Sequence, residues 1–261
     1  MTFAPSRRRR ALGALALTLS LGLAACSTDT PAGPPPPPPS QDNPAPAGPQ
    51  FVPPYRFGDA QEKAPPLANG ETPVLRRVPT TKPYVFITMD DGAVKAPEAQ
   101  QLIQQSGTRP VLFLNQRYVK GHEAYFRSIL DSTGAELGDH TVDHPNLRGK
   151  SFDFQRKQIC DTADAFEQEL GRRPALFRPP FGNYDQTTLR AAVSCGMRAT
   201  VLWTASVNDG QVQFQSGTKL KPGDIVLMHF RKTFAEDFTA FLDQARRDGL
   251  TPVPLADFLA A

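Results

Sequence analysis

The 261-residue chain contains only three cysteines, and outside its first residues it has no excess of positive charge. None of the cysteines has the spacing of metal-binding cysteines, so a thiolate metal site is not expected. Residues 1–25 hold four arginines and no acid, which leaves 25 Lys and Arg against 26 Asp and Glu in the remainder. This balance removes the compositional case for nucleic-acid binding. The hydrophobic share of 39% supports a folded core, which excludes a wholly disordered chain.

The first residues have the pattern of an export signal. Arg7–Arg10 precede an apolar run, Ala11–Ala25, which is shorter than the ~20 residues of a membrane-spanning helix. The run leads to Leu23-Ala24-Ala25-Cys26, which resembles the lipobox of bacterial lipoproteins; an uncleaved hydrophobic helix is the alternative. The resemblance implies a lipidated Cys26 that anchors an exported protein to the outer face of the bacterial cell membrane. The arginines fit either the general or the twin-arginine export route.

Proline is concentrated after this signal. Between Pro31 and Pro83 lie 17 of the 27 prolines, including the unbroken run Pro34–Pro39. Such a segment cannot bury enough apolar surface to fold, but it stays extended, so residues 26–80 are predicted to be a disordered, semi-rigid tether. A ligand for a proline-recognising module is the less favoured alternative. Four apolar residues indicate that the end of the tether packs onto the next domain: Phe51, Tyr55, Phe57 and Val74.

Residues 81–261 are predicted to form one α/β domain. Short β-branched and aromatic runs alternate with helical patterns, with strands expected at 84–87, 111–114, 136–137, 176–177, 199–203 and 224–228 and helices at 97–105, 124–130, 152–170, 187–193 and 234–247. This alternation indicates βα units and a mainly parallel sheet with covered faces. The domain has no evident internal repeat and is shorter than the ~250 residues of a full eight-fold barrel. We therefore expect a smaller or distorted (β/α) barrel.

Chemically capable side chains follow five of the expected strands. Because catalytic groups of βα folds lie at the C-terminal strand ends, these residues are candidates for one site; they are Asp90, Asp91, His140, His144, Arg178, Asp209 and His229. The fourth histidine, His122, lies before a helical pattern and is expected to be structural or exposed.

The candidates divide into metal ligands and proton-transfer groups. His140 and His144, four residues apart, are expected on one face of a helical turn, and Asp91 is the natural third ligand. Three protein ligands and an open position are typical of catalytic zinc. Asp90 would then accept a proton from metal-bound water, and Arg178 would hold Asp90 ionised and oriented. A solvated turn at residues 90–92 and a structural ion pair remain the alternatives.

His229 follows an apolar strand, 224–228, so a buried structural histidine is one interpretation. With Asp209 as its acid partner, the pKa of His229 would be raised, and the histidine would keep a proton available for a leaving group.

In sequence order, these residues resemble the motifs of the polysaccharide deacetylases of carbohydrate esterase family 4, the NodB homology domain. The resemblance covers roughly residues 84–260 and rests on Thr88–Gly92 (T-F-D-D-G, with Met89 for Phe), His140–His144 (H-T-x-x-H), Arg178–Gly182 (R-P-P-[YF]-G) and Leu227–His229 (L-x-H). The motif after Trp203 departs, because Ser206 stands for its first Asp and Gly210 for its second Trp. Losing that Trp removes one wall of the sugar site and leaves the substrate preference open.

The resemblance implies the family's distorted barrel and one divalent metal, usually Zn²⁺, with Asp91, His140 and His144 as its ligands. It also implies that Asp90 is the base, that Arg178 orients Asp90, and that His229 is the acid with Asp209 as its partner. For the substrate it implies that Leu227 lines the acetyl pocket, that the Phe181 N–H binds the oxyanion, and that Trp203 contacts the sugar. It also implies metal-dependent hydrolysis of an N-acetyl or O-acetyl group on a glycan. A lipid tether limits reach to the envelope, so peptidoglycan amino sugars are the favoured substrate of an expected monomer.

Cys160 and Cys195 form an even pair in an exported chain, which favours a disulfide between the two predicted helices.

Two rival functions stay open. One is a catalytically silent glycan-binding lipoprotein, for which keeping both an acid and a base has no use. The other is a metal-dependent amidase or imidase of a small molecule, which the altered motif after Trp203 allows.

Overall fold

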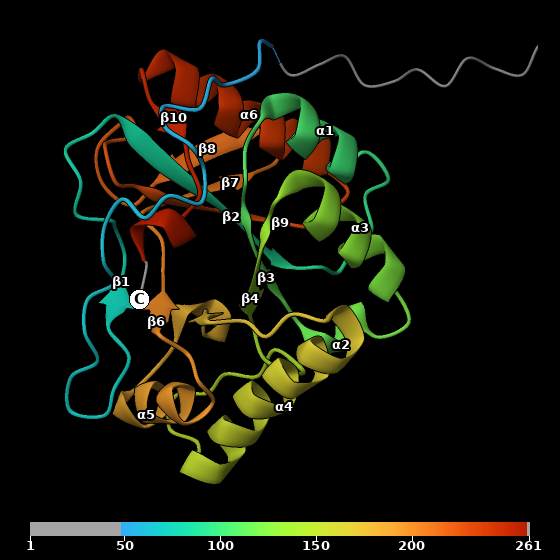
Figure 1. Ribbon diagram of the computed structural model, residues 1–261, viewed down its shortest axis with the longest axis vertical. Helices are drawn as coiled ribbons and strands as arrows, with labels where there is room; N and C mark the ends of the chain where they lie inside the picture. The colour runs from blue at the N-terminus through green and yellow to red at the C-terminus, as the bar shows by residue number, and fades with distance from the viewer. Residues whose placement is uncertain (1–47, 260–261) are drawn as a thin grey trace, which may run out of the picture. The chain divides into compact units, whose positions relative to one another are not determined.

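The computed structural model describes residues 48–259, so the expected signal peptide, Cys26 and the polyproline run lie outside the described residues. No helix in the described part of the chain is long and apolar enough to cross a membrane. The described residues form an α/β fold in which a curled, mainly parallel sheet carries helices on its outer face (Figure 1).

The sheet has ten strands and does not close into a full barrel. Along it, each strand pairs with its neighbours in the order β1 (Val74–Leu75), β6 (Ala199–Val201), β5 (Leu176–Phe177), β4 (Glu136–Asp139), β3 (Val111–Leu114), β2 (Tyr84–Asp91), β9 (Ile225–His229), β7 (Ala205–Asn208) and β8 (Gln211–Phe214), with β10 (Thr251–Pro252) beside β2. Among the described strands, β1 and β8 end this order and do not pair with each other. The expected distorted barrel is confirmed.

Six α-helices accompany the strands: α1 (Ala99–Ser106), α2 (Gln116–Val119), α3 (Glu123–Thr133), α4 (Phe152–Leu170), α5 (Gln186–Ser194) and α6 (Phe234–Arg247). Two short 3-10 turns, η1 (Pro180–Gly182) and η2 (Ala256–Phe258), complete the described elements. Helix α4 begins where the Ser151 side chain accepts a hydrogen bond from Phe154 N, and it ends at Gly171, whose φ of 70° is left-handed. The sequence thus encodes both ends of this helix.

Strand β2 shows how the sheet positions the site. Its side chains alternate between two apolar clusters, as the two-residue period of a strand requires. Val85 and Met89 belong to the cluster shared with α1, α3 and α6, whereas Phe86 belongs to a second cluster with no α-helical residue. Thr88 and Asp90 follow Phe86 on the same face, so the alternation that builds the core also directs the Asp90 carboxylate to the inner face of the curl.

Residues 48–80, the described part of the predicted tether, contact the domain at several points. Phe51 packs against the helix-covered cluster, and Tyr55 and Phe57 pack against the second cluster. Val74 pairs in parallel with Thr200 at the β1 edge of the sheet. The four apolar residues singled out in the sequence therefore lie on the α/β fold.

One hairpin was missed by the sequence analysis. Strands β7 and β8 are antiparallel and are joined by Asp209 and Gly210, with φ values of 50° and 70°. Positive φ at both central residues is the geometry of a tight two-residue hairpin turn, for which Asp-Gly is a preferred pair. Asp209 is therefore exposed at a hairpin tip. The expectation that it lies at a strand end and faces the other site candidates is wrong.

Cys160 of α4 and Cys195, at the end of α5, are joined by a disulfide across 35 positions of sequence. Closing a loop of this length restricts the unfolded chain, so replacing both cysteines by Ala is expected to lower the free energy of unfolding by about 3 kcal/mol. Urea denaturation with and without reductant measures the change. Reductant should shift the wild-type midpoint and leave the double variant unchanged; a wild-type midpoint insensitive to reductant would contradict the expectation.

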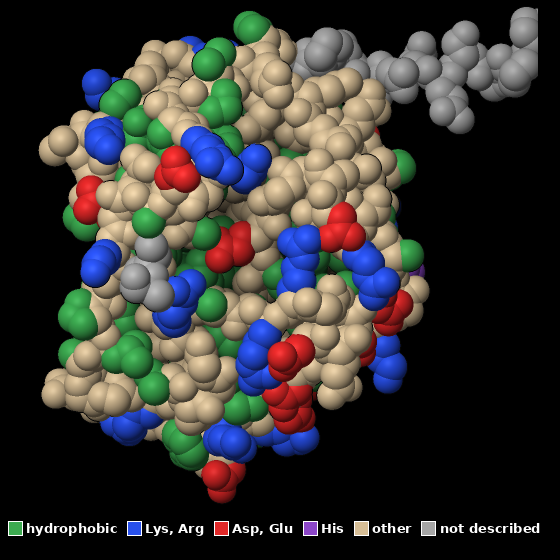
Figure 2. Space-filling view, in the orientation of Figure 1, with side chains coloured by type: hydrophobic (Ala, Val, Ile, Leu, Met, Phe, Trp, Pro, Cys, Tyr) green, Lys and Arg blue, Asp and Glu red, His purple; other side chains and the backbone are tan. Residues whose placement is uncertain are grey.

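A cavity of about 450 Å³ lies at the opposite ends of the strands from Asp90, lined by the arginines Arg109, Arg172, Arg173 and Arg198 and by Glu136 and Asp257, among others. On the face drawn in Figure 2, Lys and Arg side chains surround a hollow that also holds acidic side chains, and almost no histidine is visible. Burial raises the pKa of Glu136 to about 7, opposed by Arg198, and its Oε2 has no hydrogen-bond partner among the described residues.

Glu136 gives the fold a pH dependence. Because its pKa is higher in the folded than in the unfolded chain, the folded state binds more protons, and stability falls as pH rises from about 4.5 to 7. Glu136→Gln should flatten this decline and stabilise the protein at pH 8 by about 2 kcal/mol, allowing for the partial exposure of the residue. Unfolding midpoints between pH 5 and 8 test this, with the exposed Glu62→Gln as control. An equal slope in all three proteins would exclude Glu136 as the cause.

Candidate functional site

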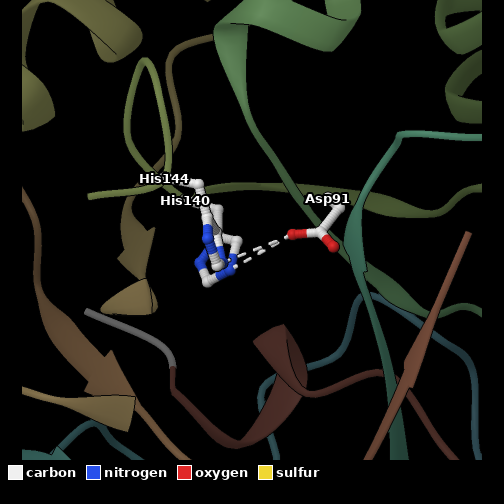
Figure 3. Close-up of side chains that lie close together, drawn as sticks. All are labelled: Asp91, His140 and His144. Atoms are coloured by element: carbon white, nitrogen blue, oxygen red, sulfur yellow. Dashed lines mark ion pairs between the residues drawn. The ribbon is translucent and has the colours of Figure 1, made fainter. Parts of the chain in front are cut away.

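Three side chains from neighbouring strand ends form a candidate metal centre. Asp91 ends β2, while His140 and His144 lie in the loop after β4. The Asp91 Oδ1 lies 3.6 Å from Nε2 of each histidine, and one ligand atom from each residue falls within 4.8 Å of the others. Figure 3 shows the two imidazoles side by side, both facing the carboxylate. Asp91 Oδ1 is buried with no hydrogen-bond partner among the described residues, so the three groups fit a divalent cation.

His140 is held in the form that binds metal. Its Nδ1 lies 2.6 Å from the carbonyl oxygen of Arg178, so Nδ1 carries the proton and Nε2 faces Asp91 with its lone pair free. Burial lowers the pKa of His140 to about 3, against the opposing attraction of Asp91. A neutral, oriented imidazole is the state that a metal ligand requires.

The two histidines do not share a helical turn, as the sequence analysis had expected. The loop carries left-handed residues, with φ of 74° at Thr141 and 61° at His144, and no residue between them is helical. The buried Asn115 side chain donates to the carbonyl oxygens of His140 and Thr141, and Asp139 Oδ1 accepts from Thr141 N at 2.9 Å. These tertiary hydrogen bonds replace helical ones and still bring the rings to 4.9 Å between centroids.

Asp90 lies beside this centre and is paired with Arg178. The Arg178 guanidinium donates to Asp90 Oδ1 at 2.7 Å, and the other carboxylate oxygen lies 3.6 Å from His140 Nε2. Burial raises the pKa of Asp90, and Arg178 is the largest influence in the opposite direction. The carboxylate is thus a buried base that is held in place by a buried cation.

The position of Arg178 is fixed on all sides. The fully buried guanidinium also donates to Thr88 Oγ1 at 2.7 Å and to the carbonyl oxygens of Val201 and Leu202. It stacks over the Phe113 ring at 4.3 Å. A Cβ at Gly138 would meet this ring at 2.4 Å, so glycine is needed there.

His229 lies next to Asp90 in the parallel pairing of β2 and β9. Burial lowers the pKa of His229, and Asp90 is the largest opposing influence. Its Nδ1 is buried without a hydrogen-bond partner in the described part of the chain. The expected pairing of His229 with Asp209 is not formed, because Asp209 is held at the hairpin tip. The pKa of His229 is therefore lowered and not raised as expected.

The expected substrate residues line the same side of the sheet. Phe181 is 62% exposed, its φ is 61°, and no hydrogen bond among the described residues uses its N–H. Leu227 is buried and pairs with Thr88, which places it on the face of Asp90 and His229. The Trp203 ring is half-buried at 5.5 Å from the Arg178 guanidinium. The structure therefore gathers all the site candidates except Asp209.

Four supporting residues were not found from the sequence: Thr88, Asn115, Asp139 and Arg231. Asn115 directly follows the expected strand 111–114, and Asp139 ends β4, two residues beyond the expected strand 136–137; these positions are the signal that could have found them. Arg231 donates to Asn208 Oδ1 at 2.6 Å. Burial raises the pKa of Asp91 and lowers that of His229, and the Arg231 charge opposes the first shift and adds to the second. Thr88 lies in the Thr88–Gly92 motif, but no sequence pattern assigned it a role.

The chain is similar in sequence to known proteins. Residues 77–200 match the family model described as polysaccharide deacetylase. This match supports a polysaccharide deacetylase domain. An uncharacterized protein of Streptomyces coelicolor is 43% identical to the chain over 156 residues, covering 59% of this chain and 62% of that protein. The chain thus spans less than two thirds of that relative. The peptidoglycan-N-acetylglucosamine deacetylase of Bacillus cereus is 28% identical to the chain over 166 residues, covering 60% of this chain and 76% of that protein.

Solved structures of similar fold are also found. A carbohydrate esterase family 4 pseudoenzyme from Bacillus anthracis superposes with a TM-score of 0.62 at 22% identity, covering 72% of this chain and 69% of that one. At this identity the likeness shows the fold alone, so the chemistry has to be argued from the residues.

Proposed function

We propose that the chain is a metal-dependent deacetylase that removes acetyl groups from amino sugars of an envelope glycan, with peptidoglycan as the favoured substrate. The observation that carries this proposal is the Asp91, His140 and His144 cluster, which lies directly beside the Asp90–Arg178 pair. A relative named as a peptidoglycan-N-acetylglucosamine deacetylase supports the substrate class.

A bound cation, proposed to be Zn²⁺, would polarise the acyl oxygen and acidify the attacking water. Asp90 takes the proton from this water, and Arg178 keeps the carboxylate aimed at it. The Phe181 N–H donates to the acyl oxygen as negative charge develops there. His229 in its protonated form, which the adjacent Asp90 carboxylate favours, gives a proton to the nitrogen as the C–N bond breaks, and this step releases acetate and a free amine. Leu227 bounds the space for the acetyl methyl group.

The proposal extends to the N-terminal residues. An exported protein lipidated on Cys26, with its domain held off the membrane by the proline-rich segment, would act on glycan within reach of its anchor. The sequence pattern of residues 1–39 supports this location.

A catalytically silent glycan-binding protein is the second candidate. It is favoured by one observation, that a solved neighbour of the same fold is named a pseudoenzyme, of which a mutant has restored enzymatic activity. The presence here of a base, three metal-ligand groups and His229 supports the enzyme instead.

Acetate release by the zinc-loaded full chain tests the proposal. Peptidoglycan, N-acetylated chitin oligomers, acetylated xylan and a simple acetate ester are compared, each with and without a chelator. Chelator-sensitive release from an amino-sugar polymer is expected. Zinc binding without release from any substrate would favour the silent binding protein, and release from small amides alone would favour an amidase.

A further inference from the structure

Two adjacent cavities extend away from the candidate metal centre. The first, of about 200 Å³, is lined by Arg76, Phe181, Gly182, Leu202, Trp203 and Gln215. The second, of about 410 Å³, is lined by Arg76, Arg148, Gly182, Asn183 and Tyr184. Because Arg76 and Gly182 line both, the two cavities lie side by side, and together they are here called the arginine groove.

The near end of the arginine groove reaches the metal ligands. The Phe181 ring, which lines the first cavity, lies 4.6 Å from the His144 ring between centroids. A Cβ on Gly182 would meet the Trp203 ring at 3.1 Å, and its φ of 68° also favours glycine. This close approach fixes the indole as a wall of the groove. A sugar whose acetyl group is at the metal centre would therefore have its neighbouring sugar in the groove.

Two arginines give the groove an uncompensated positive charge. Arg76 and Arg148 are exposed, and neither side chain has an ion pair or hydrogen bond within residues 48–259. No acidic residue lines either cavity within that range. Three acids close to the groove residues in sequence have other partners. Asp185 caps α5 and accepts a hydrogen bond from Gly149 N, Glu71 pairs with Arg190, and Asp143 accepts a hydrogen bond from Gln158 Nε2. By contrast, Arg77 is paired with Asp224.

We propose that the arginine groove binds a carboxylate-bearing sugar next to the acetylated sugar, and that Arg76 and Arg148 hold its carboxylate. Guanidinium groups bind carboxylates through paired, charge-assisted hydrogen bonds, which two free arginines on one cavity can provide. Trp203 and Tyr184 present ring surfaces for the sugar body. This inference rests on the proposed deacetylase function and narrows its substrate to an acidic glycan.

The test compares two glycans that differ only in charge. Peptidoglycan strands freed of their stem peptides carry a carboxylate on the sugar, and converting that carboxylate to an amide gives the matched neutral substrate. We expect the zinc-loaded full chain to favour the acidic strand about tenfold in kcat/KM. Arg76→Gln and Arg148→Gln should each remove most of this preference by raising KM at unchanged kcat, without affecting the neutral strand. Arg247→Gln, on the far end of α6, is the control and should retain the preference.

Equal kcat/KM on the two strands, or equal losses on both in the arginine variants, would overturn the inference and leave the deacetylase function standing. Peptidoglycan strands that retain their stem peptides are a third substrate. If the enzyme preferred only these strands, the arginines would bind a carboxylate of the peptide, which would contradict the proposed carboxylate on the sugar. If no strand releases acetate, the deacetylase function fails, and calorimetric binding of the two strands to the same variants still decides the inference.

Discussion

Replacing Asp90 by Asn is expected to reduce acetate release by about 10² to 10⁴-fold, because the amide cannot accept the proton that the attacking water gives up. The amide keeps the shape of the carboxylate and can still accept a hydrogen bond from Arg178. The three metal-ligand groups are not altered, so bound zinc should stay at one ion per chain. Single-turnover acetate release and elemental analysis of the same sample measure the two effects separately.

Asp209→Asn is the matched control for this substitution. Asp209 is exposed on the β7–β8 hairpin and is not paired with His229, so its amide should leave the rate within about twofold of wild type. A loss at Asp209 as large as that at Asp90 would show that the hairpin closes over His229 during turnover. Full activity of Asp90→Asn would remove Asp90 from the mechanism.

Replacing Arg178 by Gln is expected to lower the free energy of unfolding by about 3 to 5 kcal/mol. The loss is large because Asp90 would remain as a buried carboxylate without its cation, and the carbonyl oxygens of Val201 and Leu202 would lose their donor. Urea denaturation of the metal-free protein gives the value directly. A loss below about 1 kcal/mol would show that water reaches Asp90 in the folded state.

The double variant Asp90→Asn/Arg178→Gln separates the two contributions. With no charge left in the pair, it should recover part of the stability lost in Arg178→Gln, while the donors to the two carbonyl oxygens stay missing. A double variant less stable than Arg178→Gln would mean that the carboxylate stabilises the fold through other groups.

The helices were predictable where periodicity and end signals coincide. Residues 152–170 and 234–247 were expected as helices and form α4 and α6 with the same bounds. The strands along which Asp90, His140, Arg178 and His229 are arranged were also located, because their apolar runs are bounded by turns. The apolar runs alone could not show which side chains face the inside of the curled sheet, since this depends on which strands pair.

The site was less predictable in its loops than in its strand ends. The loop from His140 to His144 takes its shape from Asn115 and Asp139, and such contacts between separate strand ends leave no local pattern. Asp209 was misplaced for a different reason. The pair Asp209–Gly210 lies between two alternating segments and predicts a hairpin turn, but the expectation followed the resemblance to a family motif instead.

The parallel pairing of β1 with β6 has a consequence for handling the protein. Val74 and Leu75 cover the backbone of β6 at one end of the sheet, where an uncovered strand would present free N–H and C=O groups to other chains. Fragments that begin at residue 81 would expose that edge and the apolar surface beneath Tyr55 and Phe57, and would be prone to self-association. The segment that leads out of the proline-rich region thus also covers an edge and an apolar surface that the domain would otherwise expose.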